Sequence, residues 1–216
     1  MNLGERVRAL APRLPAGERS RVETAAGRLA EFLEILLAKN AAMNLVSARS
    51  ADPAVLVEAH LFDALLGLAQ LPEPGERALR LLDLGSGGGF PAIPLLIARP
   101  DLSGTLVESS RKKAAYLEET LRRLALTARA VNARFPDAYP MEQRPRYDVL
   151  TTRAVGSAGQ LAAAARRVLA PGARALLWTT GPLADAAVKA SGAQKHSFHP
   201  APGADQRGIL RLECFT

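Results

Sequence analysis

The run with the clearest chemical potential is Asp-Leu-Gly-Ser-Gly-Gly-Gly-Phe-Pro at positions 83–91. Gly85, Gly87 and Gly89 occupy alternate positions, and glycine lets a backbone adopt positive φ and approach a ligand closely. The run lies between an apolar stretch and a helical one, where the start of the helix presents free N–H groups. This is the position of the nucleotide-binding loop in Rossmann-like folds. A tight turn with no ligand is the structural alternative.

Two carboxylates restrict the choice of ligand. Asp83 directly precedes the glycines, and Glu108 lies 25 residues further on, at the end of the next predicted strand. An acid in the position of Glu108 can accept hydrogen bonds from ribose hydroxyls. Asp83 would repel the pyrophosphate of a dinucleotide, whereas it suits the cationic end of S-adenosylmethionine. The spacing Asp-x-Gly-x-Gly-x-Gly also differs from the dinucleotide pattern. We therefore favour S-adenosylmethionine over NAD as the ligand.

The residues available for catalysis exclude several kinds of methyl transfer. The fourth predicted strand ends in Leu-Thr-Thr-Arg-Ala (150–154), without the Asn/Asp-Pro-Pro-aromatic run of aminomethyltransferases. The lone cysteine, Cys214, lies in the last predicted strand, where we expect it to be packed rather than to act as a nucleophile. No histidine is paired with an obvious carboxylate base. Guanine N7 has a free lone pair and no proton to lose, so it suits a site that works by positioning.

The elements that must position these residues fall into two parts. Residues 1–14 and 17–39 are predicted helices, and Asp52 caps a third that begins at Pro53 and runs to about Gly67. Its predicted inward face comprises Val55, Leu56, Ala59, Phe62, Leu65 and Leu66. Prolines and a glycine at 72–75 then break the chain. We expect a helical N-terminal segment over 1–75 and a second domain over 76–216.

Strands and helices alternate in the second part. The predicted strands are 78–84, 104–108, 127–132, 147–151 and 174–179, with a closing hairpin of 194–198 and 208–215. The predicted helices are 90–98, 109–124, 157–169 (ending at Pro171-Gly172) and 182–190. This alternation predicts an α/β fold with a mostly parallel sheet.

Charge and composition indicate the partner. The chain has 216 residues and a net charge of +7, and residues 99–174 alone hold fourteen basic and seven acidic residues. Lys112, Lys113 and Arg123 lie on one predicted helix and are candidates for RNA phosphate contacts, although helical spacing points them in different directions. A solvated, arginine-rich surface is the alternative. No apolar run of membrane-spanning length is evident, and one cysteine excludes an internal disulfide. We expect a cytoplasmic monomer with no metal and no membrane partner.

Taken together, these residues resemble the bacterial 16S rRNA guanine-N7 methyltransferase G family, also called the glucose-inhibited-division protein B family. The resemblance runs from about Asn40 to the C-terminus. It rests on Asn-Leu at 44–45, His-Leu-Phe-Asp-Ala-Leu at 60–65, the run 83–95, Leu-Val-Glu-Ser at 106–109 with Lys112-Lys113, and Arg-Ala at 153–154. The phenylalanine and two spaced prolines that follow the glycines are the most specific part of the match.

This resemblance implies a Rossmann-like methyltransferase domain, with a seven-stranded sheet and closing hairpin, under an N-terminal helical cap. It implies S-adenosylmethionine as cofactor and 16S rRNA of the small ribosomal subunit as partner. By position, Gly85 and Phe90 would line the methyl-donor pocket, and Phe135 and Pro136 would lie by the adenine. Arg153 would face the donor or the target base as the catalytic residue. Each has a structural alternative: Phe90 in the core, Arg153 in an ion pair, and His60 with Asp63 fastening the cap.

The chain also departs from the family pattern. Ala59 replaces an arginine, Pro136 replaces a glutamate, and Trp178-Thr179 replaces Lys-Gly at the end of the fifth predicted strand. These changes affect the expected substrate side more than the cofactor side. A small-molecule methyltransferase and an RNA-binding relative that has lost turnover therefore stay open as alternatives, with NAD oxidoreduction more distant.

Overall fold

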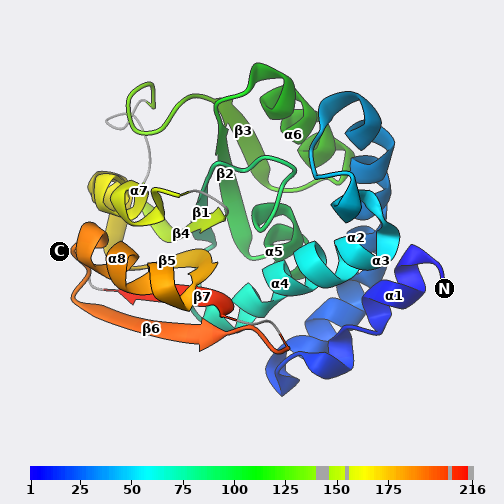
Figure 1. The fold of residues 1–216 in the computed structure, drawn as a ribbon, viewed down its shortest axis with the longest axis horizontal. Coiled ribbons are helices and arrows are strands. Elements are labelled where there is room, and N and C mark those ends of the chain that lie inside the picture. The colour runs from blue at the N-terminus through cyan, green and yellow to red at the C-terminus, as the bar shows by residue number, and fades with distance from the viewer. Residues whose placement is uncertain (140–145, 154–155, 204–205, 214–216) are drawn as a thin grey trace.

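The computed structural model describes residues 1–139, 146–153, 156–203 and 206–213. Within them a seven-stranded sheet has the order β3-β2-β1-β4-β5-β7-β6, with helices on both faces (Figure 1). The first five strands in this order are parallel, and β7 is antiparallel to both β5 and β6. The predicted mostly parallel sheet with a closing hairpin is confirmed. Ala154, Cys214 and Phe215 lie outside the described residues.

The strands agree closely with the predicted positions. Their bounds are β1 Leu79–Leu84, β2 Leu102–Glu108, β3 Ala128–Asn132, β4 Tyr147–Arg153, β5 Leu169–Thr180, β6 Lys195–Pro200 and β7 Arg207–Glu213. The helix predicted over 157–169 is observed as α7 Ala158–Ala165 and a 3₁₀ turn Arg166–Val168, but the predicted start of β5 at Arg174 is wrong, because this strand begins at Leu169 and contains Pro171 and Gly172. Leu169 pairs with Tyr147 and Arg174 with Val149, so the residues between form a bulge. Proline and a glycine at φ 77° fit such a bulge.

The helices form a layer on each face of the sheet. On the N-terminal side are α1 Leu3–Arg8, α2 Ala16–Met43, α3 Pro53–Leu56, a π-helical turn Val57–Phe62, α4 Asp63–Leu65, α5 Ala92–Ala98 and α6 Arg111–Arg123. On the other side are α7 Ala158–Ala165 and α8 Gly181–Ser191. Short 3₁₀ turns cover Ala11–Arg13, Arg49–Ala51, Leu66–Gln70 and Arg166–Val168.

The helix that begins at Pro53 is capped as predicted, and its buried face agrees only in part with the predicted one. Asp52 accepts hydrogen bonds from the amides of Ala54 and Val55 at 2.9 and 3.1 Å. Val55, Ala59 and Leu66 were expected to face inward but are only half-buried. The fully buried positions are Leu56, Val57, Leu61, Phe62, Ala64, Leu65 and Leu68. The π-helical turn explains the difference, because its wider winding shifts every later side chain around the axis.

Two hydrophobic clusters lie on the two faces of the sheet. Along β1, Leu79 and Leu81 belong to the cluster under the N-terminal helices, whereas Leu82 and Leu84 belong to the cluster under α7 and α8. The period-2 alternation of a strand produces this division. The N-terminal helices, α5 and α6 therefore share one core with the sheet, and that core determines which side chains can meet at the strand ends.

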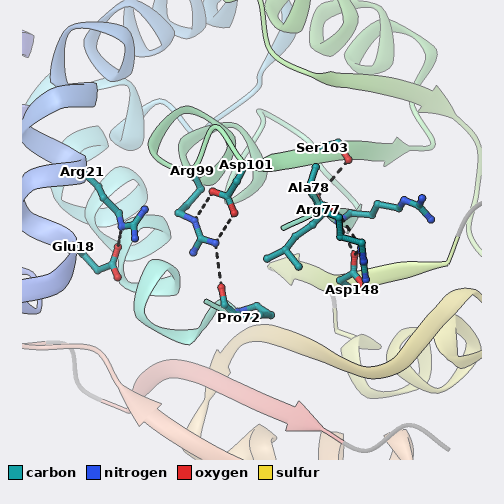
Figure 2. A network of polar contacts seen from close by, with 11 residues as sticks. Glu18, Arg21, Pro72, Arg77, Ala78, Arg99, Asp101, Ser103 and Asp148 are labelled. Carbon is teal, nitrogen blue, oxygen red and sulfur yellow. Dashed lines mark hydrogen bonds and ion pairs between the residues drawn. The ribbon is translucent and has the colours of Figure 1, made fainter. Parts of the chain in front are cut away.

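Polar contacts lie at the amino-terminal ends of the central strands β1, β2 and β4 (Figure 2). Arg99, only 2% exposed, makes two 2.7 Å contacts with Asp101 and donates to the Pro72 carbonyl at 3.1 Å. Arg77 binds Asp148 through both of its terminal nitrogens, at 2.8 and 2.6 Å. These contacts fasten the segment that leads from the helical layer into β1 to the rest of the sheet.

The expectation that no apolar run reaches membrane-spanning length is wrong by length and composition. The 18-residue run Pro53–Gln70 has a mean hydropathy of 1.2. Its Leu56, Leu61 and Leu65 are fully buried in the core under the sheet. A core helix meets the same criteria of length and composition as a membrane-spanning one, and these leucines belong to that core.

Candidate functional site

The glycine loop, residues 85–89, turns sharply at the end of β1. Gly85, Gly87 and Gly89 have φ values of 75°, 51° and 97°, in a region that side chains disfavour. A Cβ at Gly89 would lie 2.6 Å from Ile93 Cδ1, whereas one at Gly87 would meet only the Gly85 carbonyl at 3.8 Å. Gly89 is thus required for packing, while Gly87 is required for the path of the backbone beside open space.

The loop amides are less free than the sequence predicted. The amides of Gly85 and Ser86 donate to the Val107 carbonyl at 2.9 and 3.2 Å, and that of Gly89 donates to the Ser86 carbonyl at 2.7 Å. The Gly87 amide donates to Glu108 at 2.9 Å. The expected open cradle of N–H groups is therefore corrected, because most of these donors already hold the loop in shape.

Asp83 is buried beside this loop with one oxygen unused. It is 1% exposed, and Thr151 on β4 donates to its Oδ1 at 2.6 Å. Its Oδ2 is buried and has no hydrogen-bond partner among the described residues. Burial raises the pKa of Asp83 to about 7, and the hydrogen bond from Thr151 opposes this rise. A buried carboxylate oxygen without a donor fits a cationic ligand group.

Glu108 ends β2 and supports the loop from the side. Its two oxygens accept from the Gly87 amide at 2.9 Å and from the Ser110 amide at 2.7 Å. Each carboxylate oxygen can accept further hydrogen bonds, so the ribose role stays a prediction. Ser110 caps α6 and carries this edge into the helix that bears Lys112 and Lys113.

The segment after β3 lies next to Glu108. The Ala133 amide donates to the Glu108 carbonyl at 3.1 Å. Phe135 and Pro136 follow two residues later, both half-buried. The Phe135 ring lies 5.4 Å from that of Tyr139 and packs against the cluster under α7 and α8. The adenine role of Phe135 and Pro136 stays a prediction.

Arg153 connects the sheet to the N-terminal helices. It is the last residue of β4, on the same face as Val149 and Thr151 by strand alternation. One terminal nitrogen binds Asp63 at 3.2 Å and the His60 carbonyl at 3.3 Å, and the other contacts His60 Nδ1. Its guanidinium carbon lies 5.4 Å from the centre of the Phe90 ring. The motif of His60 and Asp63 thus holds Arg153 in place, as the fastening alternative predicted.

Burial shifts the pKa values of the titratable groups in this cluster. Burial, together with the nearby Arg153, lowers the pKa of His60 to about 4, so Nδ1 is free to accept a hydrogen bond. Burial raises the pKa of Asp63, while Arg153 and Arg207 oppose that rise. Phe90 packs below, with its ring centre 5.2 Å from that of Phe32 and 5.5 Å from that of His60. Phe90 therefore joins the core to the cluster.

A cavity of about 720 Å³ opens beside Arg153 at the ends of β4 and β5; we call it the strand-end cavity. Its apolar wall comes from Val55, Ala59, Trp178 and Leu183, and its charged rim comes from Arg49, Asp63, Arg153 and Arg207. The Trp178 indole is fixed, because Nε1 donates to the Asp63 carbonyl at 2.9 Å. Two of the family departures, Ala59 and Trp178-Thr179, thus lie on the walls of this cavity.

The three candidate RNA contacts separate along α6. Lys112 and Lys113 lie in the first turn, next to Ser110 and Glu108, and Lys112 is exposed. Arg123 lies at the far end, roughly 16 Å away at 1.5 Å per residue, and forms a 3.7 Å ion pair with Glu31. The structure therefore brings the two lysines to the site but not Arg123.

Sequence reasoning missed Arg49, Arg207 and Thr151. Thr151 meets Asp83 only through the register of β1 and β4, and Arg207 reaches the cavity only through the pairing of β7 with β5. The one usable signal was the family departure at Trp178, which pointed to this strand end. Among the described residues, no group of three or more His, Cys, Asp or Glu side chains could hold a metal ion.

Known proteins match this chain over most of its length. A profile of the family described as rRNA small subunit methyltransferase G (GidB) matches residues 26–198. The ribosomal RNA small subunit methyltransferase G of Acidiphilium cryptum is 37% identical over 178 residues, which cover 80% of this chain and 78% of that protein. The protein of the same name from Sorangium cellulosum is 44% identical over 130 residues, 60% of this chain and 53% of its own length. The chain thus spans only about half of that second relative.

A solved structure shows the shared fold independently of close sequence similarity. The carbon methyltransferase CurJ matches with a TM-score of 0.60 at 14% identity, over 99% of this chain and 71% of its own. At this identity the likeness concerns the fold alone, and the fold is the Rossmann-like one of methyltransferases that use S-adenosylmethionine.

Proposed function

The chain belongs to the rRNA small subunit methyltransferase G family, and from this premise we propose that it transfers a methyl group from S-adenosylmethionine to N7 of a guanine in 16S rRNA. The observation that carries the proposal is the position of Arg153. It lies between the Asp83 edge, where the donor would bind, and the strand-end cavity, where a base would enter. The same proposal locates the protein in the cytoplasm, as a monomer acting on the small ribosomal subunit.

The residues at the end of β1 fit the donor. The unused Oδ2 of Asp83 suits the ammonium of its amino-acid part. Gly87, with open space above its Cα, allows close approach, and Glu108 would accept hydrogen bonds from the ribose hydroxyls. Phe135 and Pro136 follow the next strand end and would cover the adenine. When bound, S-adenosylmethionine supplies an electrophilic methyl group, and the chain supplies its orientation.

The strand-end cavity fits the acceptor. A purine needs flat apolar walls, which Trp178, Ala59 and Val55 provide. The target base must leave its stack to enter. Guanine N7 carries no proton, so the chain needs no strong base, and Arg153 would orient the base through its guanidinium while Asp63 and His60 hold it. Lys112 and Lys113 would contribute phosphate contacts beside the site, and Arg123 would do so only at the far end of α6, where it pairs with Glu31.

Calorimetry and mass mapping together test this proposal. We expect S-adenosylhomocysteine to bind, and we expect mass mapping of rRNA incubated with protein and donor to locate one newly methylated guanine. Glu108→Gln should weaken S-adenosylhomocysteine binding by about ten- to a hundredfold, because each charge-assisted hydrogen bond contributes about 1.5–3 kcal/mol. Glu119→Gln, an exposed change on α6, is the matched control.

The alternatives give different results in the same assays. Donor binding with rRNA left unmodified, and no salt-dependent RNA affinity, would support a small-molecule methyltransferase. Tight RNA binding without methyl transfer from a saturating donor would indicate a relative without turnover. A loss below about threefold in Glu108→Gln would count against the ribose role.

A further inference from the structure

Of the residues that the structure describes, the rim of the strand-end cavity holds three arginines but only one carboxylate, Asp63, to pair with them. Arg49, Arg153 and Arg207 come from the turn before α3, the end of β4 and the start of β7. The facing carboxylate, Asp63, is bound to Arg153 at 3.2 Å, and His60 has a pKa of about 4 and is neutral. The nearby Glu58 is paired with Arg13 at 2.8 Å.

Strand register aims Arg207 into this cavity. Trp178 pairs with Arg153 on one side and with Ile209 on the other, and Thr180 pairs with Arg207. Ile209 faces the same core cluster as Trp178, so Arg207, two residues earlier on β7, lies on that same face. Two strand spacings and two residues along the strand put its Cα roughly 12 Å from that of Arg153.

Arg49 and Arg207 are free to bind an external anion. Both side chains are exposed, and within the described part of the chain neither forms an ion pair. Arg207 also acts electrostatically on His60, Asp63 and Arg153, which indicates that its charge reaches the cavity. Guanidinium groups bind phosphate in a bidentate manner. The cavity therefore combines a flat apolar wall, suited to a base, with a cationic rim, suited to a phosphate.

We propose that Arg207, assisted by Arg49, is a phosphate-binding residue that holds the RNA backbone phosphate next to the target guanine while the base occupies the strand-end cavity. This inference rests on the proposed function and names a contact within it. The end of β5 carries Trp178, Thr179 and Thr180 but no basic residue. Arg207, on the closing hairpin, provides a cation beside that strand end.

Steady-state methyl transfer to 16S rRNA tests the contact. Arg207→Gln should raise KM for rRNA by about tenfold, and the slope of log affinity against log salt should become less steep by about one. S-adenosylhomocysteine affinity should not change. Arg207→Lys keeps the positive charge, so its KM for rRNA should lie close to the wild-type value. Arg129→Gln is the matched control, because Arg129 is exposed and lies at the opposite ends of the strands.

A second measurement separates failure of this inference from failure of the proposed function. With S-adenosylhomocysteine bound, guanosine 5′-monophosphate should bind about five- to tenfold more tightly than guanosine, and Arg207→Gln should abolish that preference. If the wild type transfers methyl but Arg207→Gln matches Arg129→Gln in KM and salt slope, the phosphate contact is wrong. If the wild type leaves rRNA unmodified, the proposed function fails, and equal binding of nucleotide and nucleoside then overturns the contact as well.

Discussion

The donor edge and the strand-end cavity are built in different ways. The donor edge consists of one continuous run, 83–91, joined to Glu108 by the hydrogen bond that the Gly87 amide donates. The cavity is assembled from the turn before α3, the π-helical turn, two strand ends and the closing hairpin. The first site is thus fixed by local backbone geometry, and the second by long-range packing. Mutations should therefore affect the two sites through different physical causes.

The largest effect should come from Gly87→Val at the donor edge. Gly87 has φ 51°, and a β-branched residue there is strained, although its Cβ has room. We expect S-adenosylhomocysteine affinity to fall by about a hundredfold or more, since a decade corresponds to about 1.4 kcal/mol. Calorimetry measures this loss, and circular dichroism should show a folded protein.

Substitutions at two other glycines serve as controls for Gly87→Val. Gly27→Val on α2 meets nothing within 4 Å and has no positive φ, so donor affinity should stay at the wild-type value. Gly89→Val would collide with Ile93 and should reduce stability as well as binding. Wild-type affinity in Gly87→Val would mean that the donor does not lie over this loop.

A change at Asp63 should affect the cavity and spare the donor edge. Asp63→Asn keeps the size of the side chain but removes the charge that holds Arg153 at 3.2 Å. A hydrogen bond to a charged group contributes about 1.5–3 kcal/mol, so kcat for rRNA methylation should fall by about ten- to a hundredfold. Donor affinity should change less than twofold. Equal losses in kcat and donor affinity would indicate that Arg153 serves the donor instead.

The same contrast explains what the sequence revealed. The run 83–91 and the alternation of strands and helices are local signals, so the mostly parallel sheet with its closing hairpin, the cap at Asp52 and the position of the glycine loop were all predictable. The contacts of Arg153 with His60 and Asp63 could be anticipated only through the family resemblance, because 90 residues separate Arg153 from Asp63. The register that brings Arg207 opposite Thr180 leaves no local signal. The π-helical turn also has no simple pattern, so only part of the buried face of that helix was predicted correctly.

The pH dependence of donor binding should reveal Asp83. Burial raises its pKa to about 7 in the donor-free protein, and the donor's ammonium would favour the ionised form. Donor affinity should therefore rise with pH from about 5.5 to 7, by at most about tenfold per unit, and level off above that value. Calorimetry in a pH series measures this slope, and Asp83→Asn should flatten it. Affinity independent of pH would exclude Asp83 as the ammonium partner.

In the donor-free protein, the free energy of unfolding should change with pH in the direction opposite to donor affinity. Between pH 4 and 7 the unfolded chain has an ionised Asp83 while the folded chain keeps it protonated. The unfolded state then binds fewer protons, so the free energy of unfolding falls as pH rises, by up to about 1.4 kcal/mol per unit from this group. Asp83→Asn should remove that contribution, which denaturant titrations at pH 5 and pH 7 can measure.

The smallest effect should come from Gly67→Ala, behind the cavity wall. A Cβ at Gly67 would lie 2.7 Å from Trp178 Cζ2, and the indole is held by its hydrogen bond to the Asp63 carbonyl. Overpacking of this kind costs about 1–3 kcal/mol, or a few degrees of Tm for a chain of this size. The displaced indole should raise KM for rRNA about threefold and leave donor affinity unchanged. Trp178 is the only tryptophan, so its fluorescence maximum reports the shift directly.

Gly27→Ala, which has free space on an exposed helix face, should keep the wild-type spectrum. An unshifted maximum together with an unchanged KM would show that the wall tolerates the methyl group, and that the cavity is less rigid than its fixed indole indicates.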